Sequence, residues 1–426
     1  MHNLRITAAA VGLLGLVLTG CATGGSSASG TSAGIKGGPG IDIAAKTITL
    51  GVITPLSGPA ALIGKPLTLG QQAYFDWVNA HGGIDGWKVK LVIKDDQYNP
   101  QLHVQDYDQM LSGVAFIGQS LGSPTTQAIE AQARQQDVLI GTAAQDSAFV
   151  EQPINAVIGT PYAIDVANGL YYVTQKLGKA GARIGIVYQN DAYGQDGLKG
   201  FLAAQAAYHF TNAGEVTYNV TDTSFTSQAL AMKNARAQYV VLTAIPTAAA
   251  AIIGSAAAIG YHPQWILQGP AWSEYLMSST GGQGGKPTPI ASVMAGAWVL
   301  GYEAGWGDAS VPGMARFLSI HNTYAASQVP DGYYMYGYCM ALMETSLLRK
   351  AIASGDLTRA NLVYTRQHLG TVDFGGLIPT ATYTPANGPA DRMTDIAVVD
   401  PSAPGFLKVL APYMEGSAAA SMTFAG

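Results

Sequence analysis

The chain has 426 residues, with 22 Lys and Arg against 27 Asp and Glu, and a formal net charge of −5 at pH 7. This acidic balance excludes a nucleic-acid partner on bulk charge. Only 12% of the residues are charged and 52 are glycine, which indicates a packed, loop-rich globular chain and excludes a disordered one.

The N-terminal segment predicts export and a lipid anchor. Arg5 precedes an apolar run, Ile6 to Gly20, that has the length of a signal peptide. The run is too short for a membrane span, which needs ~20 apolar residues. It ends in Leu18-Thr19-Gly20-Cys21, which is similar to a bacterial lipobox, the motif whose cysteine is lipidated after cleavage. We expect residues 1–20 to be a signal peptide and Cys21 to carry the lipid.

A flexible tether is expected to follow the lipidated cysteine. Residues 22–40 are rich in Gly and Ser and lack apolar periodicity, so they cannot bury enough surface to offset their ordering entropy. We assign residues 21–45 to this tether. The body is then held by lipid alone at the outer face of the cytoplasmic membrane, or in the periplasm or outer membrane. With Cys21 lipidated, Cys339 has no intramolecular partner, and its Tyr- and Met-rich surroundings indicate a buried packing residue.

Roughly 380 residues remain from Lys46 onward, which suggests two domains or lobes. Short β-branched runs alternate there with helix-like stretches. The first series has expected strands at 47–53, 87–94, 114–118 and 137–141, and helices at 70–79, 101–111 and 124–135. The second has strands at 183–188, 215–220, 238–243 and 264–268, and helices at 164–177, 193–208, 226–235 and 247–259. This alternation predicts an α/β fold of two similar lobes with parallel sheets and right-handed crossovers.

The pattern becomes less regular after Gly281. Residues 293–299 fit a strand, 331–353 a long helix, and 380–383 with 395–399 a terminal hairpin. A tail that revisits both lobes would form their hinge. Open parallel sheets bind ligands beyond the carboxyl ends of their strands. This rule selects the loops 54–64, 119–126, 142–147, 189–194, 243–247 and 269–274.

One motif offers a catalytic alternative. Residues 118–122, Gly118-Gln119-Ser120-Leu121-Gly122, spell the nucleophile elbow of serine hydrolases, and His81-Gly82-Gly83 is a fragment of an esterase oxyanion-hole motif. The His-Gly-Gly fragment follows a helix-like run, however, where glycines suit a helix end. The next helix start fits Ser123 as N-cap and Pro124 at its first position, which leaves Ser120 in a loop.

A hydrolase also needs a histidine on a loop after a late strand. His209, His262, His321 and His368 lie in helix-like stretches or turns without such a motif. A secreted serine esterase stays an alternative hypothesis, and the leading expectation is a protein that is not an enzyme.

Other chemistry finds little support. No His, Cys and Asp cluster has metal-ligand spacing, and no Gly-rich turn resembles a dinucleotide fingerprint or a P-loop. Asp95-Asp96 lies between a strand and a helix, where capping and turn formation explain it better than a catalytic pair. We expect no catalytic residues, no metal and no cofactor.

Several motifs in one order resemble a known family. These are Gly51–Gly70 with its Ser-Gly-Pro loop, Asn79–Pro100, the pair 116–128 and 138–149, Asn190–Gly194, and Ile266–Pro270. The chain is similar from about Thr47 to Asp400 to substrate-binding lipoproteins of branched-chain amino acid-type ABC importers, the Leu/Ile/Val-binding-protein-like type I periplasmic binding proteins.

The resemblance implies two Rossmann-like lobes joined by a three-crossing hinge. Lobe 1 would comprise 46–163 and 292–372, and lobe 2 would comprise 164–291 and 373–426. The lobes would close on a small molecule and deliver it to ABC permease subunits, the protein acting as a monomer. The implied ligand-binding residues are Ser57, Ser120, Gly122, Ser123, Thr125, Ala143, Ala144, Gln145, Tyr193, Ile245, Ala271, Trp272, Glu274 and Tyr333.

Some of these positions depart from the amino-acid-binding pattern. Ala271 stands where such proteins often carry an acidic residue for the ligand ammonium, and Ile245 stands in place of a tyrosine. An unpaired ammonium in a closed cleft costs several kcal/mol. The ligand is therefore an amino acid whose ammonium Glu274 takes over, or an amide, a related carboxylate or an aromatic molecule. A sensory receptor of the same fold is a further alternative.

Overall fold

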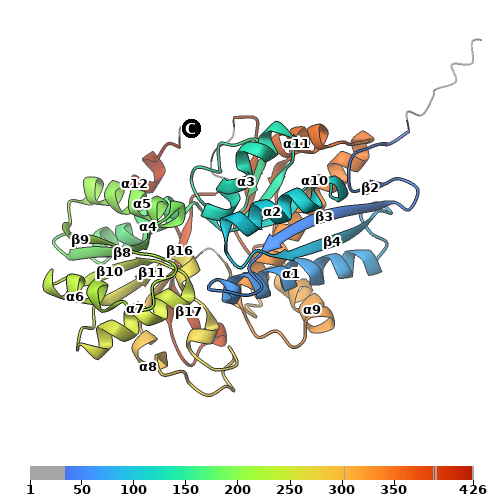
Figure 1. The fold of residues 1–426 in the computed structure, drawn as a ribbon. Helices are drawn as coiled ribbons and strands as arrows, with labels where there is room; N and C mark the ends of the chain where they lie inside the picture. The colour runs from blue at the N-terminus through green and yellow to red at the C-terminus, as the bar shows by residue number, and fades with distance from the viewer. Residues whose placement is uncertain (1–33, 302, 387, 389–390, 425–426) are drawn as a thin grey trace, which may run out of the picture. The chain divides into compact units, whose positions relative to one another are not determined.

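The computed structural model describes residues 34–301, 303–386, 388 and 391–424. The predicted signal peptide and Cys21 lie outside the described residues, as does most of the predicted tether. Residues 35–426 form one compact unit, and Figure 1 shows its two α/β lobes.

The first lobe is built on a six-stranded sheet. Its strands are β2 (Ile41–Asp42), β3 (Thr47–Thr54), β4 (Lys88–Asp95), β5 (Ile117–Leu121), β6 (Ile140–Ala143) and β7 (Asn155–Val157). Strands β4, β3, β5, β6 and β7 run parallel in that order, and β2 pairs antiparallel with β3. Nearly every residue of β3 and β5 is buried, as expected for central parallel strands covered on both faces.

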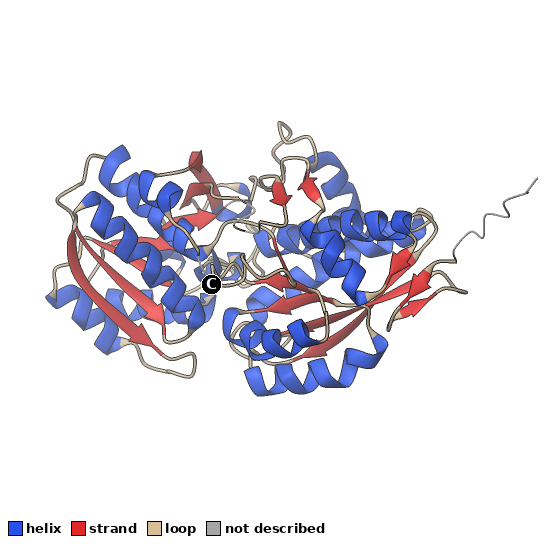
Figure 2. Cartoon of the chain, turned by 90° about the horizontal axis from the view of Figure 1, so that it is seen from above, coloured by secondary structure: helices blue, strands red, loops and turns tan. Residues whose placement is uncertain are grey.

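Helices cover both faces of this sheet (Figure 2). They are α1 (Ala61–Ala80), α2 (Pro100–Met110), the short η1 (Leu111–Gly113), α3 (Ser123–Gln135), α9 (Met314–Tyr324), α10 (Gly332–Ser354) and α11 (Arg359–Gln367). α1 packs along α10, and Gly70 and Gly337 allow the close approach, since a Cβ at either glycine would collide with the opposite backbone. Cys339 is a fully buried free thiol in α10, as predicted.

The second lobe has a seven-stranded sheet in the order β17-β16-β12-β11-β10-β8-β9. The strands are β8 (Arg183–Gln189), β9 (Thr211–Tyr218), β10 (Tyr239–Thr243), β11 (Gln264–Leu267), β12 (Trp298–Gly301), β16 (Thr394–Val399) and β17 (Leu407–Met414). β8 to β12 are parallel, and β16 and β17 are antiparallel additions. The helical segments are α4 (Tyr162–Tyr171), η2 (Tyr172–Lys176), α5 (Ala192–Tyr208), α6 (Thr226–Asn234), α7 (Pro246–Ala258), η3 (Gly269–Ala271), η4 (Glu274–Leu276), α8 (Ala291–Met294), η5 (Pro404–Phe406) and α12 (Ser417–Ser421).

The lobe boundaries differ from the predicted ones at three places. β12 pairs with β11 and β16, so residues 298–301 belong to lobe 2, and the predicted strand 293–299 is replaced by α8 and β12. β14 (Gly370–Val372) pairs with β15 (Ala381–Tyr383), whose Tyr383 hydroxyl donates to the Val157 carbonyl of lobe 1. β1 (Lys36–Gly37) pairs with β13 (Asp356–Leu357), and β2 with β3, so the ordered body begins about ten residues before Lys46.

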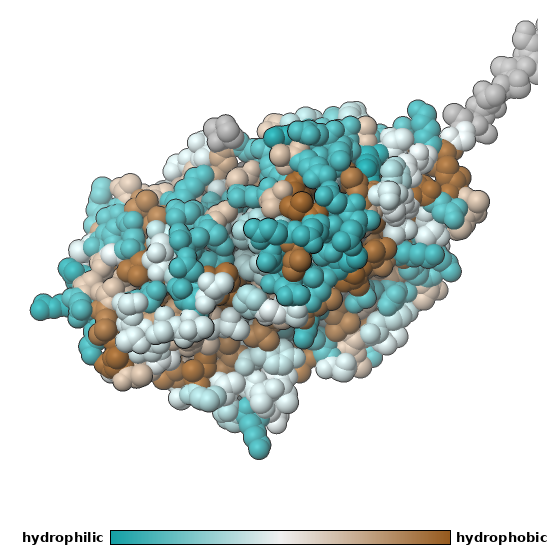
Figure 3. Space-filling model, viewed as in Figure 1, coloured by the Kyte–Doolittle hydropathy of each residue, from teal (hydrophilic) through white to brown (hydrophobic). Residues whose placement is uncertain are grey.

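The chain passes between the lobes before α4, between β12 and α9, and between β15 and β16. This is the predicted three-crossing hinge. Among the described residues, no helix is long and apolar enough to cross a membrane. On the face shown in Figure 3, hydrophilic residues lie over α2 and α3 and apolar residues form small patches.

Candidate ligand-binding cleft

The main cleft lies where the carboxyl ends of both parallel sheets face each other. Its cavity volume is about 150 Å³. Its lining from lobe 1 and the segment before α10 is Ile63, Leu67, Tyr98, Leu121, Gly122, Ser123, Ala143, Gln145, Pro330, Asp331, Gly332, Tyr333, Met335 and Tyr336. Its lining from lobe 2 and the crossing segments is Tyr162, Asp165, Tyr193, Ile245, Gln268, Gly269, Pro270, Trp272, Glu274, Val299, Leu300, Gly301, Glu303, Ala304, Gly305, Trp306, Asp395, Ala397, Pro404, Gly405, Leu407 and Val409.

Most of the residues predicted to bind ligand line this cavity. They are Gly122, Ser123, Ala143, Gln145, Tyr193, Ile245, Trp272, Glu274 and Tyr333. Their contact with a ligand stays a prediction. Ser57, Ser120, Thr125, Ala144 and Ala271 do not line it.

Each of these five residues has contacts or a buried position elsewhere in the structure. The exposed Ser57 donates through Oγ to Asp95 Oδ2 at 2.6 Å, which holds the loop before α1. Thr125 Oγ1 donates to the Gly122 carbonyl at 2.9 Å and so closes the first turn of α3. Ala144 and Ala271 are fully buried.

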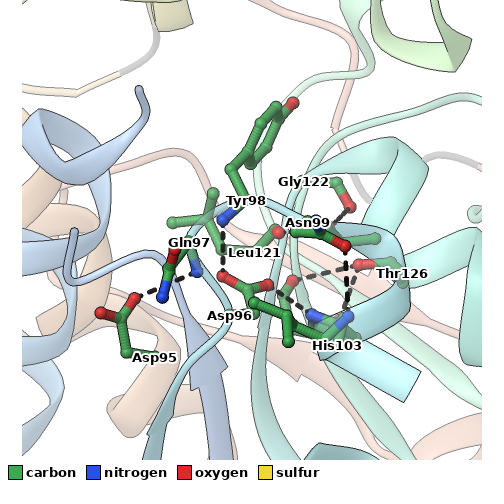
Figure 4. A network of polar contacts seen from close by, with 12 residues as sticks. Asp95, Asp96, Gln97, Tyr98, Asn99, His103, Leu121, Gly122 and Thr126 are labelled. Atoms are coloured by element: carbon green, nitrogen blue, oxygen red, sulfur yellow. Dashed lines mark hydrogen bonds and ion pairs between the residues drawn. The ribbon is translucent and has the colours of Figure 1, made fainter. Parts of the chain in front are cut away.

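Ser120 belongs to a buried polar chain, whose members Asp96, His103 and Thr126 are labelled in Figure 4. Asp96 Oδ2 lies 2.6 Å from His103 Nδ1, and His103 Nε2 lies 2.9 Å from Ser120 Oγ. Ser120 Oγ also lies 2.7 Å from Thr126 Oγ1. Asp96 Oδ1 accepts from the Tyr98 N–H at 3.0 Å. These polar contacts thus connect the loop after β4 to α2, β5 and α3.

This order of serine, histidine and carboxylate is that of a hydrolase triad. No sequence pattern pointed to this triad, because His103 lies on α2, only a few residues after Asp96, and not on a loop after a late strand. All three side chains are fully buried and none lines the cleft. In this structure the network of Asp96, His103 and Ser120 fixes the position of Tyr98, which does line the cleft.

The structure tests two local predictions, the N-cap of α3 and the role of the His-Gly-Gly fragment. The α3 N-cap is Gly122, at a φ of 100°, and Ser123 is the first helical residue, so the predicted N-cap was one residue late. Gly82 and Gly83 have positive φ values and follow the C-cap His81 of α1, which confirms that the His-Gly-Gly fragment ends a helix.

Tyrosine and tryptophan side chains form much of the cleft wall. Tyr193, at the first turn of α5, donates through its hydroxyl to Gln268 Oε1 at 2.6 Å, and its ring meets Tyr162 edge-on at 4.8 Å. Its hydroxyl is therefore already engaged, and its ring is the part left for a ligand. Gln268 Nε2 in turn donates to Asp165 Oδ2 at 3.2 Å.

Hydrogen bonds join the two lobes around the cleft. Tyr333 at the start of α10 donates through its hydroxyl to the Trp272 carbonyl at 2.8 Å. Outside the cleft lining, the Ser147 N–H, after β6, donates to Asp196 Oδ2 on α5 at 3.0 Å. These bonds place lobe 1 segments against lobe 2 segments, so the structure holds the cleft closed.

The charged residues that line the cleft are all acidic. They are Asp165, Glu274, Glu303, Asp331 and Asp395, with no Lys, Arg or His among the lining residues. Burial raises the pKa of Glu274 well above its usual range, and the neighbouring Asp331 raises it further. Burial raises the pKa of Asp331 and of Asp395 to about 7, and that of Asp165 well above its usual range. Within the described part of the chain, no group of three or more His, Cys, Asp or Glu has metal-site geometry.

Few of the missed lining residues had a sequence pattern that pointed to them. Tyr98 follows a predicted strand and Gln268 is the last residue of another, so both were within reach of the strand-end rule. Glu303, Asp395 and Leu407 come from the irregular C-terminal third, whose path the periodicity did not define.

Comparisons with known proteins agree on the kind of fold. A fatty acid ABC transporter substrate-binding protein from Thermomonospora curvata has 28% sequence identity and a TM-score of 0.84, covering 91% of this chain and 97% of that one. A branched-chain amino acid ABC transporter structure from Thermus thermophilus, with bound valine, has 14% identity and a TM-score of 0.75, covering 88% and 97%. The second likeness shows the fold alone.

Sequence relatives are named for Leu, Ile and Val binding. A Brucella abortus homologue is 26% identical over 329 residues, 72% of this chain and 78% of the relative. A Brucella melitensis homologue is 38% identical, but over 71 residues that span only 19% of its length. The sequence profile of the family described as periplasmic binding protein matches residues 47–404. The chain therefore belongs to the periplasmic binding protein family, whose members bind solutes outside the cytoplasm.

Proposed function

We propose that the chain captures a small molecule between its two lobes outside the cytoplasm and delivers it to the permease of an ABC importer. The observation that supports this most is a cavity walled by the strand ends of both sheets, at which the Tyr333 hydroxyl of lobe 1 donates to the Trp272 carbonyl of lobe 2. A ligand that touches both walls would favour the closed state over the open one. The proposal includes a monomer anchored through a lipid on Cys21.

A thermal-shift screen tests solute capture. The panel contains amino acids, small amides, aromatic acids and amines. A solute at 100 times its Kd stabilises the protein by about 2.7 kcal/mol, which raises the melting temperature by several degrees. The result that would overturn the proposal is a panel without any shift together with no co-purified small molecule.

A pair of tyrosine variants locates the binding site. Tyr193→Ala removes a ring from the cleft wall, whereas Tyr364→Ala removes one that is 57% exposed on lobe 1. The ligand-induced shift should shrink in the first variant and persist in the second. Equal shifts in both variants would place the solute elsewhere.

The triad geometry at Ser120 supports a second candidate, a serine esterase. Because Ser120 is fully buried, we expect no turnover of generic esters by the purified protein. Turnover that Ser120→Ala abolishes would favour the esterase. If cells that lack this protein no longer take up the solute, the protein acts in transport and not in a purely sensory role.

A further inference from the structure

Two carboxyl groups from opposite lobes meet in the cleft wall. Glu274 follows β11 in lobe 2, and Asp331 is the N-cap of α10 in lobe 1, where Oδ1 accepts from the Tyr334 N–H at 3.1 Å. The Gly332 N–H, next to Asp331, donates to Glu274 Oε1 at 3.3 Å. Both side chains line the cavity and are almost fully buried, with exposed fractions of 3% and 1%.

The remaining oxygen of each carboxyl lacks a donor. Neither Glu274 Oε2 nor Asp331 Oδ2 accepts a hydrogen bond from any other group of the described residues. Two adjacent buried carboxylates repel each other strongly, and burial raises the pKa of both groups, so at least one of the two carboxyls holds a proton in the free protein near neutral pH. The titratable groups that face this pair are Glu303, Tyr275 and Tyr333, none of which brings a positive charge.

The rest of the wall suits the same kind of ligand. Tyr98, Tyr162, Tyr193, Trp272, Trp306, Tyr333 and Tyr336 line the cavity together with the carboxyls, and no lining residue is basic. Aromatic faces attract organic cations, and desolvation strengthens that attraction. A ligand carboxylate would instead enter a cavity whose ionisable groups are all acids.

We propose that the cleft binds an organic cation without a carboxylate, and that its ammonium lies between Glu274 and Asp331. This inference rests on the proposed solute-binding function and narrows its ligand class. On binding, the ammonium displaces a proton from the pair, which leaves to solvent, and both carboxyls are then carboxylates. One cation then bridges lobe 2 and lobe 1, which links ligand binding to closure. The Trp272 Nε1–H, a buried donor without a partner among the described residues, suits a neutral oxygen of the same ligand.

Matched probes test the ligand class by isothermal titration calorimetry. The set is 3-methylbutylamine, leucinamide, leucine and 4-methylpentanoate, together with phenethylamine, phenylalanine and 3-phenylpropanoate. The cations should bind at least tenfold tighter than the amino acid and the acid of the same set. They should release close to one proton per ligand near pH 6, measured as the dependence of the enthalpy on the ionisation enthalpy of the buffer.

The pH dependence follows from the proton that is displaced. Because burial raises the pKa of Asp331 to about 7, cation affinity should rise about tenfold from pH 6 to pH 8, since at the higher pH the free protein no longer has to lose that proton. A carboxylate ligand would show the opposite trend. The variants Glu274→Gln and Asp331→Asn should each weaken cation binding at least tenfold, and Asn keeps the N-cap of α10. Glu215→Gln, on the exposed face of β9, is the matched control and should change nothing.

Several outcomes would overturn this assignment. Tighter binding of leucine, phenylalanine or either acid overturns the cation class but leaves solute capture intact. If both variants still bind the amines as tightly as the parent protein does, the carboxyl pair does not hold the ammonium. If none of the probes binds, the cation assignment fails, and the wider thermal-shift panel shows separately whether the proposed solute capture fails with it.

Discussion

The chain from Asp96 through His103 to Ser120 should be a major source of stability in lobe 1. Ser120→Ala leaves His103 Nε2 without its partner and removes one partner of Thr126 Oγ1. A buried polar group left unpaired costs about 1–3 kcal/mol. His103→Leu leaves the buried Asp96 carboxyl with only the Tyr98 N–H, so Asp96 Oδ2 also becomes an unpaired buried polar atom, at a further cost of about 1–3 kcal/mol.

Urea unfolding of both variants measures these losses as changes in the transition midpoint at an unchanged m value. Ser319→Ala, at an exposed position of α9 in the same lobe, is the control and should stay within about 0.5 kcal/mol of the parent. The double variant Ser120→Ala/His103→Leu should lose less than the sum of the single variants, because both changes disrupt one network. A loss in Ser120→Ala as small as that of the control would refute the structural role of the chain.

Two further predictions concern stability. Raising the pH from 5.5 to 8 should lower the free energy of unfolding: burial raises the pKa of Asp146, Asp331 and Asp395 to about 7, so the native state holds protons that the unfolded chain has already released. For each group, the free energy of unfolding falls by about 1.4 kcal/mol per pH unit as the pH rises from the unfolded to the folded pKa value. Thermal denaturation at both pH values checks this, and a higher melting temperature at pH 8 contradicts it. Gly337→Ala should destabilise the α1–α10 contact by about 1–3 kcal/mol, since its Cβ would collide with the Leu67 backbone. Gly284→Ala, with open space around the glycine, is the control in the same denaturation experiment, and equal stabilities of the two variants would refute the packing argument.

Periodicity predicted the two parallel sheets well because each strand is a short buried apolar run between amphipathic helices. It failed where local composition and tertiary packing disagree. α1 begins at Ala61, nine residues before the predicted start, because Gly64, Pro66 and Gly70 all disfavour a helix locally. Packing of α1 against α10 outweighs that preference.

The site could be predicted only where it follows the strand ends. Gly122, Tyr193 and Trp272 lie beyond β5, β8 and β11, so the rule for open sheets located them. Asp331 lies between α9 and α10 in lobe 1, outside the loops that this rule selects, and its proximity to Glu274 joins residues far apart in sequence. No local pattern encodes that contact.

The proposed function requires that one small molecule is held between the two lobes. A crystal structure with a solute selected by the thermal-shift panel tests it most directly. We expect the solute in the cavity, with contacts to the Gly122–Ser123 loop of lobe 1 and to Trp272 or Glu274 of lobe 2. A solute that contacts one lobe only, or that lies outside this cavity, would contradict it.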